Sequence, residues 1–202
     1  MHTQPALHIS NVVYGREHRG TRVSYLVDPR GHGTARDIPE VVVLRRWRAR
    51  KTDGYHFSGG RMPPSTWRAL PMILGDDVST WSDFSEREIA ERKVASAEAR
   101  RALKVDAPAP NAIVALIAVC GAERLRAFVT RHADPTRWAS PGVPDLFLFA
   151  WQDEPRRVLG RFVEVKKPEE PLKPSQVEEL TYLNGIGLKA RVLRLTERGL
   201  AR

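Results

Sequence analysis

Two apolar stretches decide the fold: GVPDLFLFAW at residues 142–151 and VLGRFVEVKK at residues 158–167. A short polar turn separates them, so we expect an antiparallel hairpin whose opposed residue numbers sum to about 311. This register places Asp145 opposite Lys166 and Phe147 opposite Glu164. Side chains alternate between the two faces of a strand, so each face has its own character. One face is apolar and is predicted to be core: Leu146, Leu148, Val163 and Val165. The other face carries charges and aromatic rings: Asp145, Phe147, Phe149, Phe162, Glu164 and Lys166.

The charged face brings two carboxylates and an amine to the open end of the hairpin. The carboxylates of Asp145 and Glu164 repel each other unless a proton or a cation lies between them. Mg²⁺ suits such a pair, because it binds one or two carboxylates together with waters and phosphate oxygens. Lys166 could then position a water or stabilise charge on a phosphate, as in a phosphodiester hydrolase. Spacing alone also allows a plain alternative, in which Glu164 and Lys166 form an edge-strand salt bridge and Asp145 caps a turn.

The same residues match a known nuclease signature. Residues 142–147 followed by residues 162–168 resemble the PD-(D/E)XK signature. The continuation, EVKKPEEPLKPSQ at residues 164–176 with Leu183 and the glycines at 185 and 187, resembles the VRR-NUC (virus-type replication-repair nuclease) family. The resemblance covers about residues 111–195. It implies an α/β fold, with a restriction-endonuclease-like mixed sheet flanked by helices. It also implies Mg²⁺-dependent cleavage of DNA phosphodiester bonds at branched, flapped or junction structures, with Mn²⁺ as a substitute.

Carried over to this chain, the family pattern assigns roles to individual residues. Asp145 and Glu164 would be metal ligands, joined by the carbonyl of Val165, and Lys166 would be the catalytic lysine. Gln176 would be a further polar residue of the catalytic site, although its position alone is that of an ordinary residue in a first helical turn. The pattern also uses an acidic residue on an upstream helix. The candidates for that acid are Glu123, Glu98 and Glu91, each of which could instead be a solvated helix residue.

The charge balance favours a polyanionic partner. The chain has 33 Lys and Arg against 24 Asp and Glu, a net charge of +9, and a solvated basic surface is the alternative explanation. Arg131 and Arg137 precede the Pro-Asp motif and could contact phosphate, or could lie in a solvated loop. Lys167 and Lys173 follow the motif and are further candidates for binding nucleic acid. A homodimer is expected by analogy with other members of the family.

Other function classes find little support in the sequence. The longest apolar run has nine residues, 112–120, whereas a membrane-spanning helix needs about 20. We find no glycine-rich loop that would cradle a nucleoside triphosphate. These features fit a cytoplasmic protein of a bacterial or phage-type context. Two rivals to a nuclease remain: a non-catalytic DNA-binding module that keeps the fold, and a module that recruits a partner protein.

We expect three regions along the chain: a β-rich accessory region at 1–84, a helical connector at 85–106 and the nuclease domain at 107–202. In the first region, residues 22–27 and 41–49 are predicted as strands, with a hairpin across Asp53-Gly54 and a loop over 58–64. Ser85 would cap a helix that runs to about residue 104. The later elements are predicted as helices at 112–120 and 125–132, a helix capped by Ser175, and a strand at 189–195.

Overall fold

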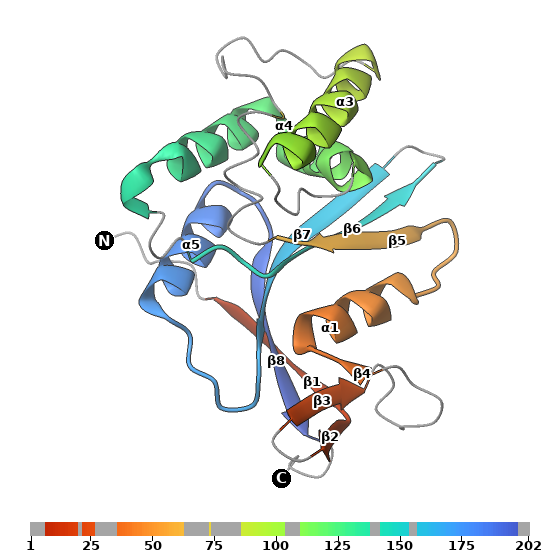
Figure 1. Cartoon of the computed structure of the whole chain (residues 1–202), viewed down its shortest axis with the longest axis vertical. Helices are drawn as coiled ribbons and strands as arrows, with labels where there is room; N and C mark the ends of the chain where they lie inside the picture. The colour runs from red at the N-terminus through yellow and green to blue at the C-terminus, as the bar shows by residue number, and fades with distance from the viewer. Residues whose placement is uncertain are drawn as a thin grey trace.

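A five-stranded mixed sheet forms the centre of the molecule (Figure 1). The computed structural model describes residues 7–19, 22–26, 36–62, 73, 86–103, 110–137, 142–153 and 157–197. The strand order is β1-β8-β7-β6-β5, in which β8 runs parallel to both of its neighbours and the other pairs are antiparallel. This architecture is the mixed sheet predicted from the sequence. Its strands are β1 His8–Tyr14, β5 His56–Arg61, β6 Leu146–Gln152, β7 Arg157–Lys166 and β8 Ala190–Glu197.

The β6–β7 hairpin confirms the predicted pair of strands, but its register differs by two residues. Phe147 pairs with Phe162, so the predicted pairing of Phe147 with Glu164 is wrong. Side chains alternate with a period of two, and every residue therefore stays on its predicted face. Extending the register beyond the start of β6 brings Asp145 opposite Glu164 rather than Lys166. The shift places the two carboxylates directly across from each other.

Helices cover both faces of the sheet and create two hydrophobic cores. The aromatic face of the hairpin packs under α4 (Pro110–Ala133), with α3 (Glu86–Leu103) beyond it and α5 (Pro174–Gly185) on the same side. Gly121 has a φ of +69° and breaks α4 in two, which matches the two predicted helices. The predicted N-cap of α3, Ser85, lies outside the described residues. The Leu and Val face of the hairpin packs against a helix from the N-terminal region, α1.

That helix, α1 (Pro39–Arg48), replaces the strand predicted over residues 41–49. Three consecutive valines at 41–43 favour a strand locally, because β-branched side chains suit a pleated surface. The helix is favoured by Pro39 in its first turn, by an acidic residue there, and by three arginines in its last turn. Val43 and Trp47 are one turn apart and both are buried against the sheet. Tertiary burial therefore outweighs the local β preference.

The segment after α1 also differs from the predicted hairpin and loop. Asp53-Gly54 does form a tight turn, closed by a bridge between Thr52 and Tyr55. Residues 56–61 then form β5 and pair with β6, so the loop predicted over 58–64 is wrong for its first half. Glycine is required within this strand, because a Cβ on Gly59 would lie 2.8 Å from the carbonyl oxygen of Phe147. Gly59 and Gly60 disfavour a strand in the local sequence, so β5 was not predicted. The strand forms because it pairs with β6.

The helix α5 begins two residues earlier than predicted. Lys173 is its N-cap and Pro174 its first residue, so Ser175 lies inside the helix and is not the cap. Gln176 reaches back and accepts a hydrogen bond at Oε1 from the backbone N–H of Lys173, at 2.9 Å. The proline is suited to the first turn, where no intrahelical partner for its missing N–H is needed. This cap fixes the side chain of Gln176 near the end of β7.

The N-terminal region is rich in strands, as predicted, but its strands do not all stand apart. β1 lies along β8 and β5 lies along β6, so residues 1–84 provide both edge strands of the central sheet. A separate three-stranded sheet is formed by β2 (Arg16–Arg19), β3 (Arg22–Leu26) and β4 (Arg36–Asp37). In the part of the chain that the structure describes, every helix is too short or too polar to span a bilayer. The division at residues 84 and 106 stays a prediction.

Candidate active site

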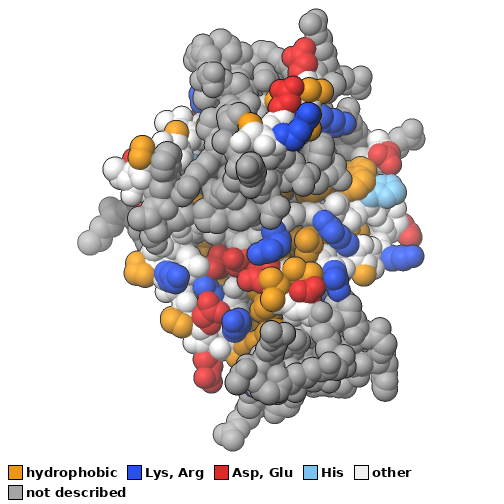
Figure 2. All heavy atoms as spheres, in the orientation of Figure 1, with side chains coloured by type: hydrophobic (Ala, Val, Ile, Leu, Met, Phe, Trp, Pro, Cys, Tyr) orange, Lys and Arg blue, Asp and Glu red, His pale blue; other side chains and the backbone are white. Residues whose placement is uncertain are grey.

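A polar cavity of about 170 Å³ opens where β6 begins, β7 ends, and α1 and α5 have their first turns. It is lined by all four predicted catalytic residues: Asp145, Glu164, Lys166 and Gln176. The predicted DNA-binding lysines, Lys167 and Lys173, lie at the same cavity, as does Val165. Figure 2 shows a group of acidic side chains near the centre of one face, with basic side chains beside it. The β6–β7 hairpin and the helices α1 and α5 therefore converge on one polar cavity.

Asp145 lies immediately before β6 and is held by the neighbouring strand. Its Oδ2 accepts a hydrogen bond from the backbone N–H of Val165, at 2.8 Å. Burial raises the pKa of Asp145 to about 6, although this hydrogen bond and the nearby Lys166 act to lower it. Negative charge on Glu40 and Glu170 adds to the increase. The carboxyl is thus placed where a cation would favour its ionised form.

Glu164 is only 1% exposed and has one oxygen engaged and one unengaged. Its Oε1 accepts hydrogen bonds from Nε2 of Gln176 and from Nζ of Lys166, the latter at 3.1 Å. Its Oε2 is buried and, among the described residues, has no hydrogen-bond partner. Burial, followed by repulsion from Asp145, raises the pKa of Glu164 to about 7. Buried carboxylate oxygens normally have a partner, so Oε2 of Glu164 is suited to bind a cation or a hydrogen-bond donor.

Lys166 is 2% exposed, and its surroundings favour the charged form of its amine. Burial acts to lower its pKa, but hydrogen bonds and attraction from Glu164 and Glu170 outweigh that effect and raise it. The distance from Nζ to Oε1 of Glu170 is 3.2 Å. Glu170 also accepts a hydrogen bond from the backbone N–H of Lys167, which closes the turn after β7. Glu164 and Lys166 do form an ion pair, but β7 lies between β6 and β8 and the pair is buried, so the alternative of an edge-strand salt bridge does not apply.

Sequence reasoning missed Glu40, which is the acidic residue that an upstream helix brings to this cavity. It lies in the first turn of α1 and its Oε2 is buried without a hydrogen-bond partner among the described residues. The predicted upstream acids lie elsewhere: Glu91 and Glu98 are exposed on α3, and Glu123 is exposed on α4. None of these three lines the cavity. A proline followed by an acid before an apolar run is a helix-start signal, and reading residues 41–49 as a strand concealed it.

The predicted phosphate-binding arginines are also placed elsewhere. Arg131 and Arg137 form ion pairs with Glu178 and Glu179 of α5, at 2.8–3.4 Å. Nε2 of His132 donates a further hydrogen bond, at 2.8 Å, to Oε1 of Glu179, whose side chain is fully buried. These interactions lower the pKa of Glu179 despite its burial. The network joins α4 to α5. Neither arginine lines the cavity that contains Asp145 and Glu164, which is called the carboxylate cavity below.

The donor set fits a divalent cation of the Mg²⁺ type. Two buried carboxylate oxygens, one each from Glu40 and Glu164, have no described partner, and Asp145 lines the same cavity. Among the described residues, no three His, Cys, Asp or Glu side chains are gathered into a complete metal-binding group. Mg²⁺ does not need such a group, because it keeps several waters and binds through one or two carboxylates and phosphate oxygens. Asp145 and Glu164 are the two carboxylates that could hold it, and Glu40 lies at the same cavity.

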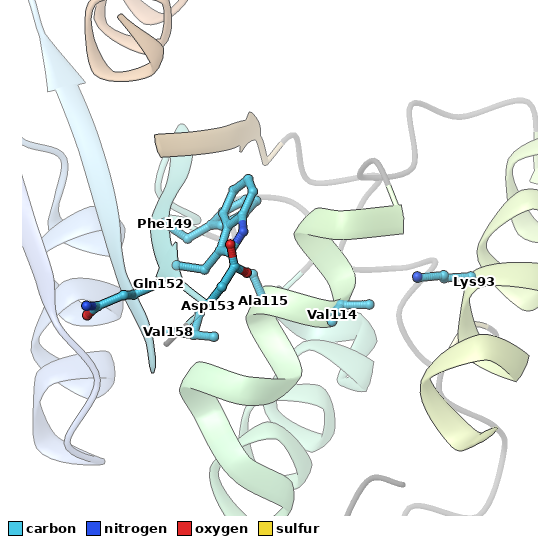
Figure 3. A pocket seen from close by; sticks show the side chains of 8 residues that line it. Lys93, Val114, Ala115, Phe149, Gln152, Asp153 and Val158 are labelled. Atoms are coloured by element: carbon cyan, nitrogen blue, oxygen red, sulfur yellow. The ribbon is translucent and has the colours of Figure 1, made fainter. Parts of the chain in front are cut away.

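A larger cavity, of about 440 Å³, lies at the other end of the hairpin, between α3, α4 and the residues where β6 ends and β7 begins (Figure 3). Its lining is mainly apolar and includes Phe149, Trp151 and Val158. Lys93 and Asp153 are the charged residues among those that line it. Among the described residues, this cavity therefore has a single carboxylate, whereas the 170 Å³ cavity is lined by several acidic side chains. Size alone therefore does not mark the active site here.

The fold is similar to that of solved structures of a protein bound to DNA. Crystal structures of paFAN1 bound to 5′-flap DNA with a gap match with TM-scores of 0.54 for a 1-nucleotide flap and 0.56 for a 2-nucleotide flap. Sequence identity is 14% and 15%, and the matches cover 97% and 98% of this chain. The same matches cover 39% of the paFAN1 chain, so this protein spans about two fifths of its length. A comparison with curated proteins found no match.

Family membership follows from the sequence itself. The VRR-NUC domain profile matches residues 81–196, which is more than half of the chain. The matched range contains the hairpin, α5 and β8, together with Asp145, Glu164, Lys166 and Gln176. Glu40 lies outside that range but lines the same cavity. The chain belongs to the VRR-NUC family.

Proposed function

We propose that this protein is a divalent-metal-dependent nuclease that hydrolyses DNA phosphodiester bonds, with Mg²⁺ as its cofactor and Mn²⁺ as a substitute. The observation that supports this most directly is the pair of carboxyls, the half-buried Asp145 and the buried Glu164, beside the amine of Lys166 in one cavity. Burying such a group without a ligand costs free energy that a bound cation and phosphate would recover.

The residues of the cavity have distinct tasks in such a reaction. A divalent cation, when bound, supplies a Lewis acid that lowers the pKa of a water molecule and neutralises charge on the phosphate. Glu164 holds the ammonium group of Lys166 inside the cavity, where that group can orient the attacking water or stabilise charge on the phosphate. Gln176 fixes the orientation of Glu164, and its own position is fixed by the backbone of Lys173. Lys167 and Lys173 provide positive charge at the mouth for the flanking phosphates.

The preferred DNA in this proposal is branched or flapped. Its support is the similarity of the fold to paFAN1 structures that contain 5′-flap DNA. This chain spans about two fifths of paFAN1, so the parts that select the substrate there need not be present here. A cytoplasmic location and a homodimer belong to the same proposal, and sedimentation of the purified chain tests the dimer.

The experiment is a panel of end-labelled DNA substrates, comprising single strand, duplex, 5′ flap, fork and four-way junction. Each is incubated with the protein and Mg²⁺, Mn²⁺ or EDTA, and the products are sized on a gel. We expect metal-dependent cleavage that Asp145→Asn, Glu164→Gln and Lys166→Ala each reduce at least about 100-fold. Lys189→Ala, an exposed lysine away from the cavity, is the matched control and should cleave normally. DNA binding without cleavage under every condition would support the non-catalytic module instead.

A further inference from the structure

Three arginines gather on the α1 side of the sheet, at the end of α1 opposite to the carboxylates. Arg50 follows α1, Arg161 lies on β7 and Arg191 lies on β8. In the parallel β7–β8 pair Arg191 is opposite Val163, which faces the same side as Arg161 two residues earlier. Figure 2 shows basic side chains over this part of the molecule. The carboxylate cavity touches the first turn of α1, whereas Arg50 and Arg161 line a separate cavity of about 280 Å³ beside its last turn.

Trp47 is a rigid support for two of these arginines. Its Nε1–H donates to the carbonyl oxygens of Ser58, at 2.8 Å, and Phe149, at 3.0 Å, which fixes the ring. The guanidinium carbons of Arg50 and Arg161 lie 5.1 Å and 5.2 Å from its ring centroid. Cation–π contact of this kind engages the face of a guanidinium and leaves its N–H edges able to donate. The arginines are thus partly ordered before any ligand arrives.

The arginine cluster lacks a counter-ion. Among the described residues, no carboxylate forms an ion pair with Arg50, Arg161 or Arg191, whereas Arg45, Arg131 and Arg137 are all paired with acids. Burial, followed by repulsion from Arg191 and Arg50, lowers the pKa of Arg161. Unpaired positive charge that is partly buried is costly and favours binding of an anion. Planar guanidinium groups bind phosphate through paired hydrogen bonds.

We propose that Arg50, Arg161 and Arg191 bind a backbone phosphate of the nucleic acid, on the face of β7 and β8 opposite to Glu164. Arg161 precedes Glu164 by three residues of β7, which is about 10 Å along a strand and corresponds to about three nucleotide steps along a duplex. The site would hold the strand away from the point of cleavage and so fix its direction across the protein. This inference rests on the proposed function only in taking nucleic acid as the ligand.

The test measures DNA binding in EDTA, where no cleavage is needed. Fluorescence anisotropy with a labelled 5′-flap duplex gives Kd at several salt concentrations for the wild type, Arg161→Gln and Arg191→Gln. Each variant should bind about tenfold more weakly, and the slope of log Kd against log salt should fall by about 1. Arg124→Gln is the matched control, because Arg124 is an exposed arginine of α4 on the opposite side of the sheet, and it should change neither quantity.

The outcomes separate this inference from the proposed function. Wild-type cleavage together with unchanged Kd and salt slope in both arginine variants would overturn the phosphate site alone. Loss of binding to inorganic phosphate, with DNA binding unchanged, would show a site for a free anion and would also overturn it. Arg191→Gln keeps the test valid if Arg161→Gln does not fold, since Arg191 does not line the cavity or contact the Trp47 ring. A wild type that does not bind DNA would overturn both proposals.

Discussion

At the scale of single residues, Gly142 connects the loop before Asp145 to the start of α5. Its φ is +64°, and a Cβ there would lie 2.1 Å from the carbonyl oxygen of Ser175. We expect Gly142→Ala to lower the free energy of unfolding by at least about 2 kcal/mol, from backbone strain and displacement of α5. Urea denaturation measures the loss. Gly185→Ala is the control, because a Cβ there meets nothing within 4 Å, and an equal loss in that variant would contradict the explanation.

Glu40 is the acidic residue that α1 contributes to the cavity lined by Asp145 and Glu164. Its unpartnered Oε2 should be a metal ligand, so Glu40→Gln is expected to weaken Mn²⁺ binding measured by calorimetry and to reduce cleavage. In EDTA the same variant should be more stable than the wild type, because a buried negative charge has been removed near Asp145. Glu98→Gln on the exposed face of α3 is the matched control. Lost cleavage in Glu98→Gln, with normal cleavage in Glu40→Gln, would show that the upstream acid lies on α3.

The two buried carboxyls make stability depend on pH in a direction opposite to that of ordinary acidic residues. Their pKa values rise on folding to about 6 for Asp145 and about 7 for Glu164. The folded state therefore binds more protons than the unfolded state between about pH 4 and pH 7, and stability from this source falls as pH rises across that window. Urea denaturation in EDTA should show a smaller fall in Glu164→Gln than in the wild type. Mg²⁺ should stabilise the wild type more at pH 8 than at pH 5, and equal stabilisation would contradict the metal site.

At the scale of elements, the ion-pair network holds α5 against α4. Glu179 has no exposed side-chain surface and contacts Arg131, Arg137 and His132. We expect Glu179→Gln to cost about 3 kcal/mol of unfolding free energy, because it leaves the half-buried guanidinium groups of Arg131 and Arg137 without this buried acid. Glu178→Gln should cost less than about 1 kcal/mol, since that side chain is 58% exposed and its ion pairs are screened. Urea denaturation of both variants provides the comparison, and equal losses would argue against burial as the cause.

The same elements show which parts of the fold were predictable. The β6–β7 hairpin and the middle of α4 have long apolar patterns. These patterns predict from the local sequence that the first is a pair of strands and the second a helix. α1 was missed because Val41, Val42 and Val43 favour a strand, and its helical form is set by burial of Val43 and Trp47. Asp145, Glu164 and Lys166 share one hairpin and could be placed together from sequence. Glu40 comes from another part of the chain, and only the fold brings it to them.

At the scale of the whole molecule, the cavity that Asp145 and Glu164 line is built from both halves of the chain. The profile match begins at residue 81, yet the sheet uses β1 and β5 from before that point. β5 supplies backbone partners to β6 along its length, and β1 does the same for β8. The α1 helix covers the Leu and Val face of the hairpin and contributes Glu40. The first 80 residues are thus structural partners of the β6–β7 hairpin, and they contribute Arg50 to the arginine cluster.

A fragment of residues 81–202 tests this dependence. It contains the whole profile match but leaves β6 and β8 as open edges and exposes the core beneath α1. Unpaired edges and exposed apolar surface favour aggregation, and loss of so much buried surface exceeds the margin of a typical domain. We therefore expect the fragment to lack a cooperative thermal transition and to lack metal-dependent cleavage, whereas the full chain has both. Cooperative unfolding of the fragment at the melting temperature of the full chain, with equal cleavage, would show instead that residues 1–80 are an accessory free to bind another protein.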